Sequence, residues 1–296
     1  MKILITGASG MIGSALSARL AAGGHDVVRL TRSPPSGPGE FRWDPTAGEI
    51  DRAAFDGVDG VVNLAGETVA GRWTETKKRR IRDSRVLGTR LLAETAAAHD
   101  PRPRTFVSAS AIGYYGDRGD EPVAEGSPIG HGFLAEVVRD WEAAADPARE
   151  AGIRAVTPRF GIVQSAAGGA LRAQLPLFRL GLGGRVGSGR QYVSWVAIDD
   201  VVGAIEFALG NEGLSGPVNV SAPQPVTNAE YARTLGRVLG RPAVLPAPAP
   251  ALRLVLGEFS GELLGGQRVR PDRLLEEGFE FEYPELEGAL RHVLGR

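Results

Sequence analysis

The sequence predicts an α/β protein with a doubly wound parallel sheet, and its opening residues are the main reason. The apolar run Ile3–Ile5 has no polar alternation, as a strand covered on both faces requires. Three glycines follow with the spacing G-x-x-G-x-x-G, and residues Met11–Ala22 then have the pattern of a helix that ends at a glycine pair. Strand and helix patterns go on alternating through the first half, which indicates a parallel sheet with helices on both faces.

The other elements of this sheet follow in chain order. Short runs rich in apolar or β-branched residues predict the strands, and longer polar-apolar patterns predict the helices between them. We expect strands at Asp26–Thr31, Phe41–Asp44, Gly60–Ala65, Thr105–Ser110 and Arg154–Thr157, and helices at Glu75–Ala98 and Phe133–Arg149.

Beyond Gly161 the pattern changes, because glycines interrupt it and indicate loops around a helix at 171–180. A strand at Val218–Val220 is expected to return to the main sheet. We therefore predict a nucleotide-binding domain over residues 1–160. Residues 161–296 would form a smaller C-terminal α/β portion that carries the substrate, with some segments returning to the main sheet.

Two helix starts are predicted in this second half. Thr227-x-x-Glu230 is a capping box that opens a helix ending at Gly240. Asp199 and Asp200 are interpreted as N-caps of the preceding helix, and they lack the partner cluster that a metal site would need.

Composition excludes several classes of function. The chain of 296 residues is 43% hydrophobic and 23% charged, and its net charge of −1 provides no overall attraction to nucleic acid or membrane. It has no cysteine, so disulfides and thiolate chemistry are excluded. No apolar run reaches the roughly 18 residues of a membrane span, and the N-terminal run is too short for a signal peptide. We expect a cytoplasmic protein, and interpret the basic run Lys77–Arg80 as a solvated helix face.

The glycine turn predicts a dinucleotide site. Gly7 permits the tight turn, Gly10 lets the backbone approach a pyrophosphate, and Gly13 lets the helix pack on the strand. The free N–H groups of the first helical turn, starting at Met11 and Ile12, would face the anion. The alternative is a glycine-rich turn without a ligand.

The end of the second strand favours NADP(H) over NAD(H). A carboxylate usually binds the ribose 2′-hydroxyl of NAD there, but the sequence reads Leu30-Thr31-Arg32-Ser33. Arg32 offers a fixed charge and a fork of donors to a 2′-phosphate, with a solvated loop cation as the alternative. Asp44 is placed to meet the adenine amino group, or is a turn residue before Pro45.

The fourth strand ends in a second candidate segment. The small residues of Asn63-Leu64-Ala65-Gly66 would let the backbone pass close to the adenine ribose. Glu67 follows directly, as a site residue beside the cofactor cleft or as a solvated loop carboxylate.

These motifs resemble the extended short-chain dehydrogenase/reductase superfamily. More narrowly, they are similar to the atypical "epimerase family" of NAD-dependent epimerase/dehydratase-like proteins, whose C-terminal portion carries a domain of unknown function. The segments that carry this likeness are Asn63–Glu67, Arg72-Trp73, Ser84-Arg85, Ser108–Gly116, Pro176–Gly184, Gly187–Tyr192, Trp195 with Ile198–Asp200, and Leu264–Gln267. The likeness also hints that Ser84 and Arg85 approach the substrate cleft.

The resemblance implies a Rossmann fold, NADP(H) binding and a nucleotide-sugar epimerase or oxidoreductase activity. It also allows a homodimer, because superfamily members often pair through the helices after the fourth and fifth strands.

Superfamily chemistry uses a Tyr, a Lys four residues later on the same helix face, and a Ser that orients the substrate. Ser110 matches the Ser position. In the helix that should carry the pair, Phe133 or Leu134 takes the Tyr place and Val137 or Val138 the Lys place. The standard mechanism is therefore absent.

Other residues are candidates for the missing proton donor. Tyr114 and Tyr115 follow Ser110 closely, although a Tyr here also suits packing. His131 could titrate near neutrality or lie in an exposed loop, and burial could raise the pKa of Glu67.

Two further residues lie at the carboxyl edge of the sheet and are candidate cofactor contacts. Ser108 is one step inside the fifth strand, and Arg159 lies just past the sixth. With Arg190 and Gln191, Arg159 suggests an anionic or polyhydroxy substrate such as a nucleotide-sugar, and structural salt bridges explain the arginines nearly as well.

Two functions stay open: an NADP(H)-dependent enzyme with a non-standard proton donor, and an NADP(H)-binding sensor or scaffold without turnover. A pocket lined by Ser110 and Tyr114 would favour the enzyme. An apolar plug from Phe133, Phe160 or Trp195 would favour the binding protein.

Overall fold

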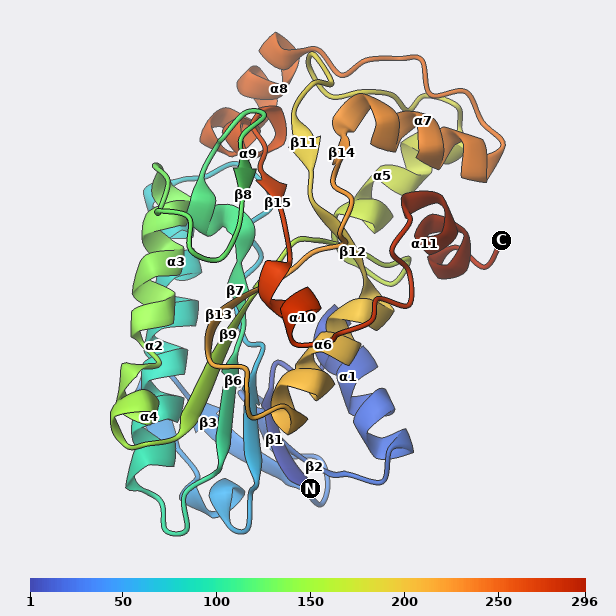
Figure 1. The fold of residues 1–296 in the computed structure, drawn as a ribbon. Coiled ribbons are helices and arrows are strands. Elements are labelled where there is room, and N and C mark those ends of the chain that lie inside the picture. Colours follow the sequence, from blue (N-terminus) through green and yellow to red (C-terminus); the bar gives the residue numbers. More distant parts are fainter.

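The computed structural model describes residues 1–296 and is built on a nine-stranded, mostly parallel sheet (Figure 1). The strand order is β13-β9-β6-β5-β1-β2-β3-β4, with β7 also paired to β9 and β4 antiparallel to β3. The strands are β1 Lys2–Thr6, β2 Asp26–Thr31, β3 Glu40–Asp44, β4 Glu49–Ile50, β5 Gly60–Asn63, β6 Thr105–Ser108, β7 Ser110–Ala111, β9 Arg154–Phe160 and β13 Gly216–Val220.

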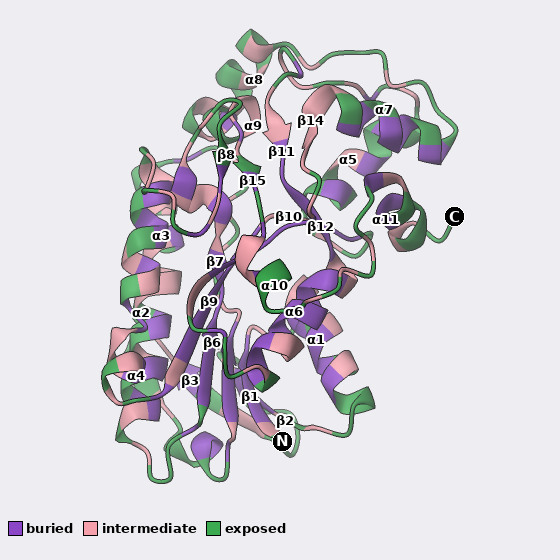
Figure 2. Cartoon of the chain, in the orientation of Figure 1, coloured by how far each residue is buried: buried purple, intermediate pink, exposed green.

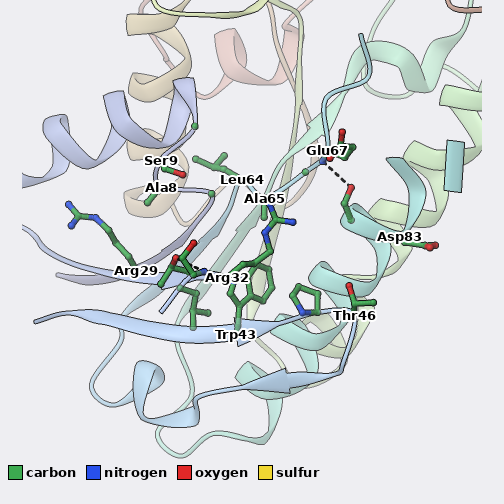
Figure 3. Close-up of a pocket in the computed structure, with 18 of the residues that line it drawn as sticks. Ala8, Ser9, Arg29, Arg32, Trp43, Thr46, Leu64, Ala65, Glu67 and Asp83 are labelled. Carbon is green, nitrogen blue, oxygen red and sulfur yellow. Dashed lines mark hydrogen bonds between the residues drawn. The ribbon is translucent and has the colours of Figure 1, made fainter. Parts of the chain in front are cut away.

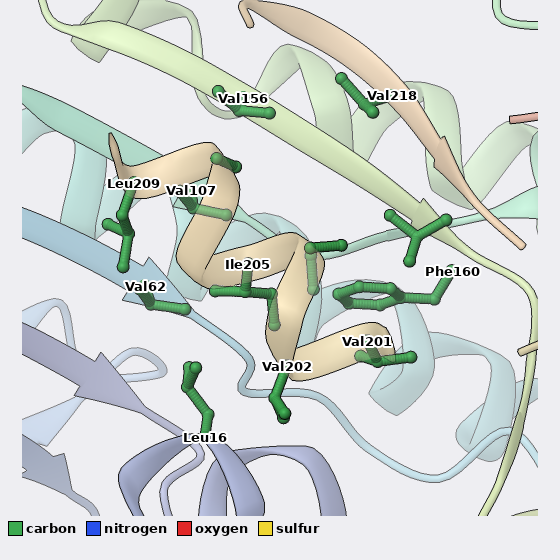
Figure 4. Packing of buried hydrophobic residues seen from close by; sticks show 14 of the residues in the cluster. Leu16, Val62, Val107, Val156, Phe160, Val201, Val202, Ile205, Leu209 and Val218 are labelled. Atoms are coloured by element: carbon green, nitrogen blue, oxygen red, sulfur yellow. The ribbon is translucent and has the colours of Figure 1, made fainter. Parts of the chain in front are cut away.

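The sheet has helices on both faces because the side chains of each strand alternate between two cores. Ile3 and Ile5 of β1 belong to the core under α1 (Met11–Ala22) and α6 (Ile198–Gly210), which Figure 4 shows around Ile205. Leu4 belongs to the opposite core, under α2 (Glu75–Ala98) and α4 (Asp146–Glu150). Figure 2 shows the strands as the most deeply buried layer.

Strand β1 marks the reversal of the chain order. From β1 the chain runs through β2 and β3 toward one edge, then returns to β5 on the other side and continues outward to β13. In open α/β sheets such a reversal leaves a crevice at the carboxyl ends of the strands, where ligands bind.

The second half adds small sheets and a core of its own. Its short strand pairs are parallel β10 with β12, antiparallel β11 with β14, and parallel β15 with β8. These strands are β8 Pro122–Val123, β10 Ile162–Gln164, β11 Tyr192–Val193, β12 Trp195–Ala197, β14 Val226–Thr227 and β15 Arg268–Val269. The helices of this half are α5 Gly169–Arg179, α7 Asn228–Leu239, α8 Ala249–Leu256, α9 Ser260–Leu264, α10 Asp272–Glu276 and α11 Leu286–Val293, whereas α3 Phe133–Ala143 belongs to the first half.

Several predicted elements have the bounds that the sequence gives them. The helices at Met11–Ala22 and Glu75–Ala98 and the strand at Asp26–Thr31 agree residue for residue, and β13 does return to the main sheet. The Thr227 hydroxyl accepts a hydrogen bond from the Glu230 N–H, which confirms this part of the capping box.

Other predicted elements differ. The fourth predicted strand ends at Asn63, the fifth is split into β6 and β7, the sixth continues to Phe160 and so contains Arg159, and the helix predicted over 133–149 breaks into α3 and α4. Pro147 explains the last difference, because proline has no N–H to continue the ladder and is favoured in the first turn of a new helix.

The structure has no helix that is both long and apolar enough to cross a bilayer.

The N-cap interpretation of Asp199 and Asp200 is wrong. Ala197 is the N-cap of α6, and both aspartates lie inside the first turn. Buried Asp200 accepts hydrogen bonds from the backbone N–H groups of Glu282 at 2.6 Å and Tyr283 at 3.2 Å, and so fastens the C-terminal tail to α6. Burial raises the pKa of Asp200 to about 6, against the pull of these two donors.

Burial of Asp200 predicts a pH-dependent difference between the protein and Asp200→Asn. The carboxyl is protonated more readily in the folded chain than in the unfolded chain, where its pKa is 3.8. Its contribution to the free energy of unfolding is therefore fully present below pH 3.8 and is lost as the pH rises through about 6. Relative to the native protein, Asp200→Asn should therefore gain up to about 3 kcal/mol of unfolding free energy over this interval. Urea titrations at a series of pH values measure the difference, and a constant offset would contradict it.

Candidate functional site

A cavity of about 700 Å³ lies where the strand order reverses (Figure 3). Four parts of the chain line it: the β1–α1 turn, the end of β2 with β3 and the residues after it, the loop after β5, and one face of α2. Eight of the predicted cofactor residues meet here, namely Gly7, Gly10, Thr31, Arg32, Leu64, Ala65, Gly66 and Glu67.

Close backbone approach explains the glycines of the turn. Gly7 has φ +67°, and a Cβ on it would lie 2.7 Å from the carbonyl oxygen of Leu64. A Cβ on Gly13 would lie 2.2 Å from the carbonyl oxygen of Gly7. A side chain at Gly7 would push the turn away from the loop after β5, and one at Gly13 would push α1 away from the turn. Either change would alter the shape of the cavity.

Helix α1 presents an anion-binding end to this turn. Its N-cap is Gly10, which provides no side-chain cap, and the first turn contains no acidic residue. The N–H groups of Met11, Ile12 and Gly13 donate to no other group, since the first intrahelical bond runs from Ser14 to Gly10. Unused donors and the positive end of the helix dipole together favour a phosphate.

Cations gather at the end of β2. Arg29 and Arg32 line the cavity from this strand, and Arg80 lines it from α2. Glu40 also lines it as a carboxylate, since the backbone N–H and hydroxyl of Ser36 hold it at 2.9 and 2.8 Å and lower its pKa, but the three guanidinium groups outnumber it. This part of the cavity therefore suits a ligand with more negative charge than a ribose hydroxyl.

Glu67 is an ion-paired residue of the cavity wall. Lys77 donates to its carboxylate at 2.8 Å and holds its pKa below the ordinary value. The expectation that burial raises this pKa is wrong, because the partner cation outweighs desolvation.

The loop that carries Glu67 is fixed from α2. The Ser84 hydroxyl accepts from the Glu67 N–H at 2.9 Å, and the Arg85 guanidinium donates to the Glu67 carbonyl at 2.9 Å. Burial lowers the pKa of Arg85 to about 10.

Some residues of the cavity were not predicted from the sequence. Trp43 and Thr46 line it from β3 and the residues after it, and Arg80 and Asp83 line it from α2 beside Ser84, which the family likeness had pointed to. Arg80 and Asp83 could have been found, because positions i, i+3 and i+4 share one face of a helix. No sequence pattern would have found Trp43, since an apolar residue on a strand looks the same whether it lines a cavity or packs in the core.

Asp44 and Ser108 do not line the cavity. The Asp44 carboxylate accepts from the N–H groups of Thr46 and Ala47, as its alternative reading as a turn residue requires. Buried Ser108 accepts from the side-chain amide of Asn63 at 3.1 Å.

Arg159 lies in the protein interior instead of the cavity. It forms two hydrogen bonds with the Glu142 carboxylate, at 2.7 Å from Nε and 2.8 Å from Nη2. Burial acts to lower its pKa, but Glu142 and Tyr115 raise it overall. The structure thus shows the salt bridge that was the alternative explanation for this arginine.

The three predicted catalytic residues all meet this ion pair. Ser110 donates to Glu142 at 2.5 Å, and Tyr114 lies with its ring centre 3.5 Å from the Arg159 guanidinium. The Tyr115 hydroxyl is fully buried, donating to Asn219 at 2.7 Å and accepting from Arg159 at 2.9 Å. Burial raises the pKa of Tyr115.

An apolar cluster occupies the place of the missing Tyr-x-x-x-Lys pair. Trp73 packs edge-on to Phe133 with ring centres 5.0 Å apart, and against Phe259 at 5.6 Å. Leu134 and Val137 belong to the same cluster. Phe160 is buried in the core under α1 and α6, Trp195 is buried in the core of the second half, and His131 is exposed.

Gln191 and Arg190, the two candidate substrate contacts of the second half, lie in different surroundings. The Gln191 side-chain amide donates to the carbonyls of Val186 and Leu263, and its Oε1 atom is buried without a partner. Arg190 is exposed.

Family comparison agrees with this architecture. Residues 3–221 match the model of the NAD dependent epimerase/dehydratase family, and residues 247–293 match a domain of unknown function, DUF1731. The chain belongs to the NAD-dependent epimerase/dehydratase family. The structural resemblance predicted from the motifs is thereby confirmed.

Individual relatives cover the whole chain. It is 46% identical to epimerase family protein Mb2239 of Mycobacterium bovis, over 99% of this chain and 98% of that one. The crystal structure of human epimerase family protein SDR39U1 with NADPH has a TM-score of 0.91 at 36% identity and full coverage of both chains. The Thermus thermophilus UDP-glucose 4-epimerase complex with NAD has a TM-score of 0.77 at 21% identity and shows the shared fold, over 100% of this chain and 99% of that one.

The close contact at Gly7 predicts the effect of a matched pair of substitutions. Gly7→Ala and Gly24→Ala both place an alanine at positive φ, +67° and +75°. Only the Cβ added at Gly7 meets backbone atoms, because nothing lies within 4 Å of the Cβ added at Gly24. Gly24→Ala should cost about 1–2 kcal/mol of unfolding free energy, and Gly7→Ala at least about 2 kcal/mol more. Chemical denaturation measures both, and equal losses would show that the contact is unimportant.

Proposed function

We propose that this protein binds NADP(H) in the cavity, with the pyrophosphate on the first turn of α1 and the 2′-phosphate beside Arg32 and Arg29. The observation that carries the proposal is the end of β2, where Arg29 and Arg32 line the cavity and this end of the strand offers no carboxylate to a ribose hydroxyl. The NADPH complex of the human relative supports the same preference. The unused N–H groups of α1 and the glycine cradle fit the rest of the dinucleotide.

Calorimetric titration of NADPH and NADH tests the cofactor preference. Arg32→Ala should weaken NADPH binding by about 1–3 kcal/mol and leave NADH binding nearly unchanged, since only the 2′-phosphate loses a partner. Arg42→Ala is the matched control, because Arg42 is exposed on β3 outside the cavity lining. If both nucleotides lost affinity equally, the role of Arg32 in recognising the 2′-phosphate would be refuted.

We further propose that the protein is an oxidoreductase or epimerase acting on an anionic or polyhydroxy substrate such as a nucleotide-sugar. Bound NADP(H) would supply the hydride donor or acceptor. Residues 1–160 would hold the cofactor and residues 161–296 the substrate, with Ser110 oriented by Glu142 at their junction. The epimerase family membership supports this activity.

A non-catalytic NADP(H)-binding sensor or scaffold is the second candidate. It is favoured by the apolar cluster of Trp73, Phe133 and Phe259 at the position of the missing proton-transfer pair. The fully bonded hydroxyl of Tyr115 favours it as well.

Turnover separates the two candidates. We expect a panel of nucleotide-sugars to include one that the protein oxidises, reduces or epimerises when NADP(H) is bound. Ser110→Ala should slow that reaction at least about a hundredfold and leave NADPH affinity unchanged. Absorbance of the reduced nicotinamide reports oxidation or reduction, and chromatography of the sugars reports epimerisation. Tight NADPH binding without turnover of any sugar in the panel would favour the sensor.

A further inference from the structure

The outer edge of the C-terminal portion combines exposed aliphatic side chains with unpaired arginines. Seven of the eleven large exposed hydrophobic residues of the protein lie on two segments, 177–187 and 241–255, which we call the outer edge. They are Leu177, Leu180, Leu182, Val244, Leu245, Leu254 and Val255. The cofactor cavity uses none of these residues, although Pro176–Gly184 is one of the segments that carry the family resemblance.

The two segments form one surface. The Leu245 N–H donates to the Gly183 carbonyl at 3.2 Å, the Ala247 N–H donates to Arg185 at 2.8 Å, and Gly187 donates back to Ala247 at 2.9 Å. Helix α8 follows directly and buries none of its residues; Leu254 is 78% exposed. Figures 1 and 2 show α8 and the connector before it at the end of the molecule far from the N-terminus.

The charged residues of the outer edge and of the chain on either side of it are all positive. Residues 165–198 and 231–257 contain eight arginines and no Asp, Glu or Lys. Four of them, Arg179, Arg185, Arg241 and Arg253, lie on the outer edge, are exposed and form no ion pair. The net charge of −1 for the whole chain therefore conceals a cationic face, and the lack of an overall attraction to membranes does not extend to this face.

We propose that the outer edge docks on an anionic lipid surface, with its leucines and valines in the interfacial layer and its arginines on lipid phosphates. Aliphatic side chains on glycine- and proline-rich loops at a molecular edge suit a fluid interface. A protein partner would instead be expected to use aromatic anchors and pockets. The outer edge exposes no aromatic ring, and neither the cofactor cavity nor a smaller one beside β15 includes any of its residues.

A second copy of the chain fits the outer edge less well than an anionic lipid surface does. A symmetric contact places the same patch on both subunits, so arginines would face arginines without a carboxylate between them. Such like-charge contacts are unfavourable in an interface.

Vesicle sedimentation tests the proposal with the whole protein. It should bind vesicles of equimolar phosphatidylglycerol and phosphatidylcholine, bind phosphatidylcholine vesicles far less, and dissociate as salt is raised. The double variant Arg241→Glu/Arg253→Glu should weaken binding at least about thirtyfold, from roughly fivefold for each arginine lost. Leu254→Asp should also weaken binding, because the apolar contact is lost.

Two controls match these variants. Arg104→Glu reverses an exposed, unpaired arginine before β6, and Leu87→Asp alters an exposed leucine on α2; neither should change vesicle binding. NADPH affinity reports that each variant is folded, since none of these residues lines the cofactor cavity.

The proposal is wrong if the native protein binds both vesicle types equally or neither, or if the controls reduce binding as much as the outer-edge variants. Light scattering that shows an oligomer broken by Leu254→Asp, without vesicle binding, would assign the surface to a contact between copies instead.

Discussion

A buried set of polar contacts at the carboxyl end of β1 determines where the parts of the cofactor cavity lie. The Thr6 hydroxyl donates to Asn63 at 2.7 Å and accepts from the N–H groups of Leu64 and Ala65, so β1 and the loop after β5 are fastened side by side. Asn63 in turn donates to Thr89 of α2 at 2.7 Å. These groups are buried, so removing one partner would leave the others unsatisfied at a cost of about 1–3 kcal/mol.

The glycine turn and the cation-lined wall both depend on this arrangement. With the loop after β5 held against β1, Gly7 must pass within backbone contact of Leu64, and the first turn of α1 then faces the same space as the end of β2. Arg85 supports the loop from behind through the Glu67 carbonyl. The turn after β1 and the loop after β5 are therefore parts of the cavity wall that cannot move independently, which favours a preformed site.

The sequence predicts the parts of the molecule that follow local rules. The glycine spacing, the apolar strands and the helix at Glu75–Ala98 depend on neighbours along the chain, and the structure has them where the sequence places them. Arg159 and Asp200 depend on partners that only the fold supplies. Glu142 lies 17 residues before Arg159, and Glu282 lies 82 residues after Asp200, with no periodicity to connect either pair. A lone charged residue therefore does not show whether it meets a ligand or an ion-pair partner.

The Arg159–Glu142 pair also decides what Ser110 can offer to a substrate. A serine hydroxyl has one proton and two lone pairs, and the proton is committed to Glu142 at 2.5 Å. Glu142 is partly buried and is held at two points by Arg159, so turning the serine proton elsewhere would leave this carboxylate short of a donor. Ser110 is itself buried and does not line the cofactor cavity, so a group that reached it would find only the lone pairs of its oxygen. A substrate group that reaches Ser110 must therefore donate a hydrogen bond, through a hydroxyl or an N–H. The hydroxyl of a sugar can do this, whereas a ketone oxygen can only accept.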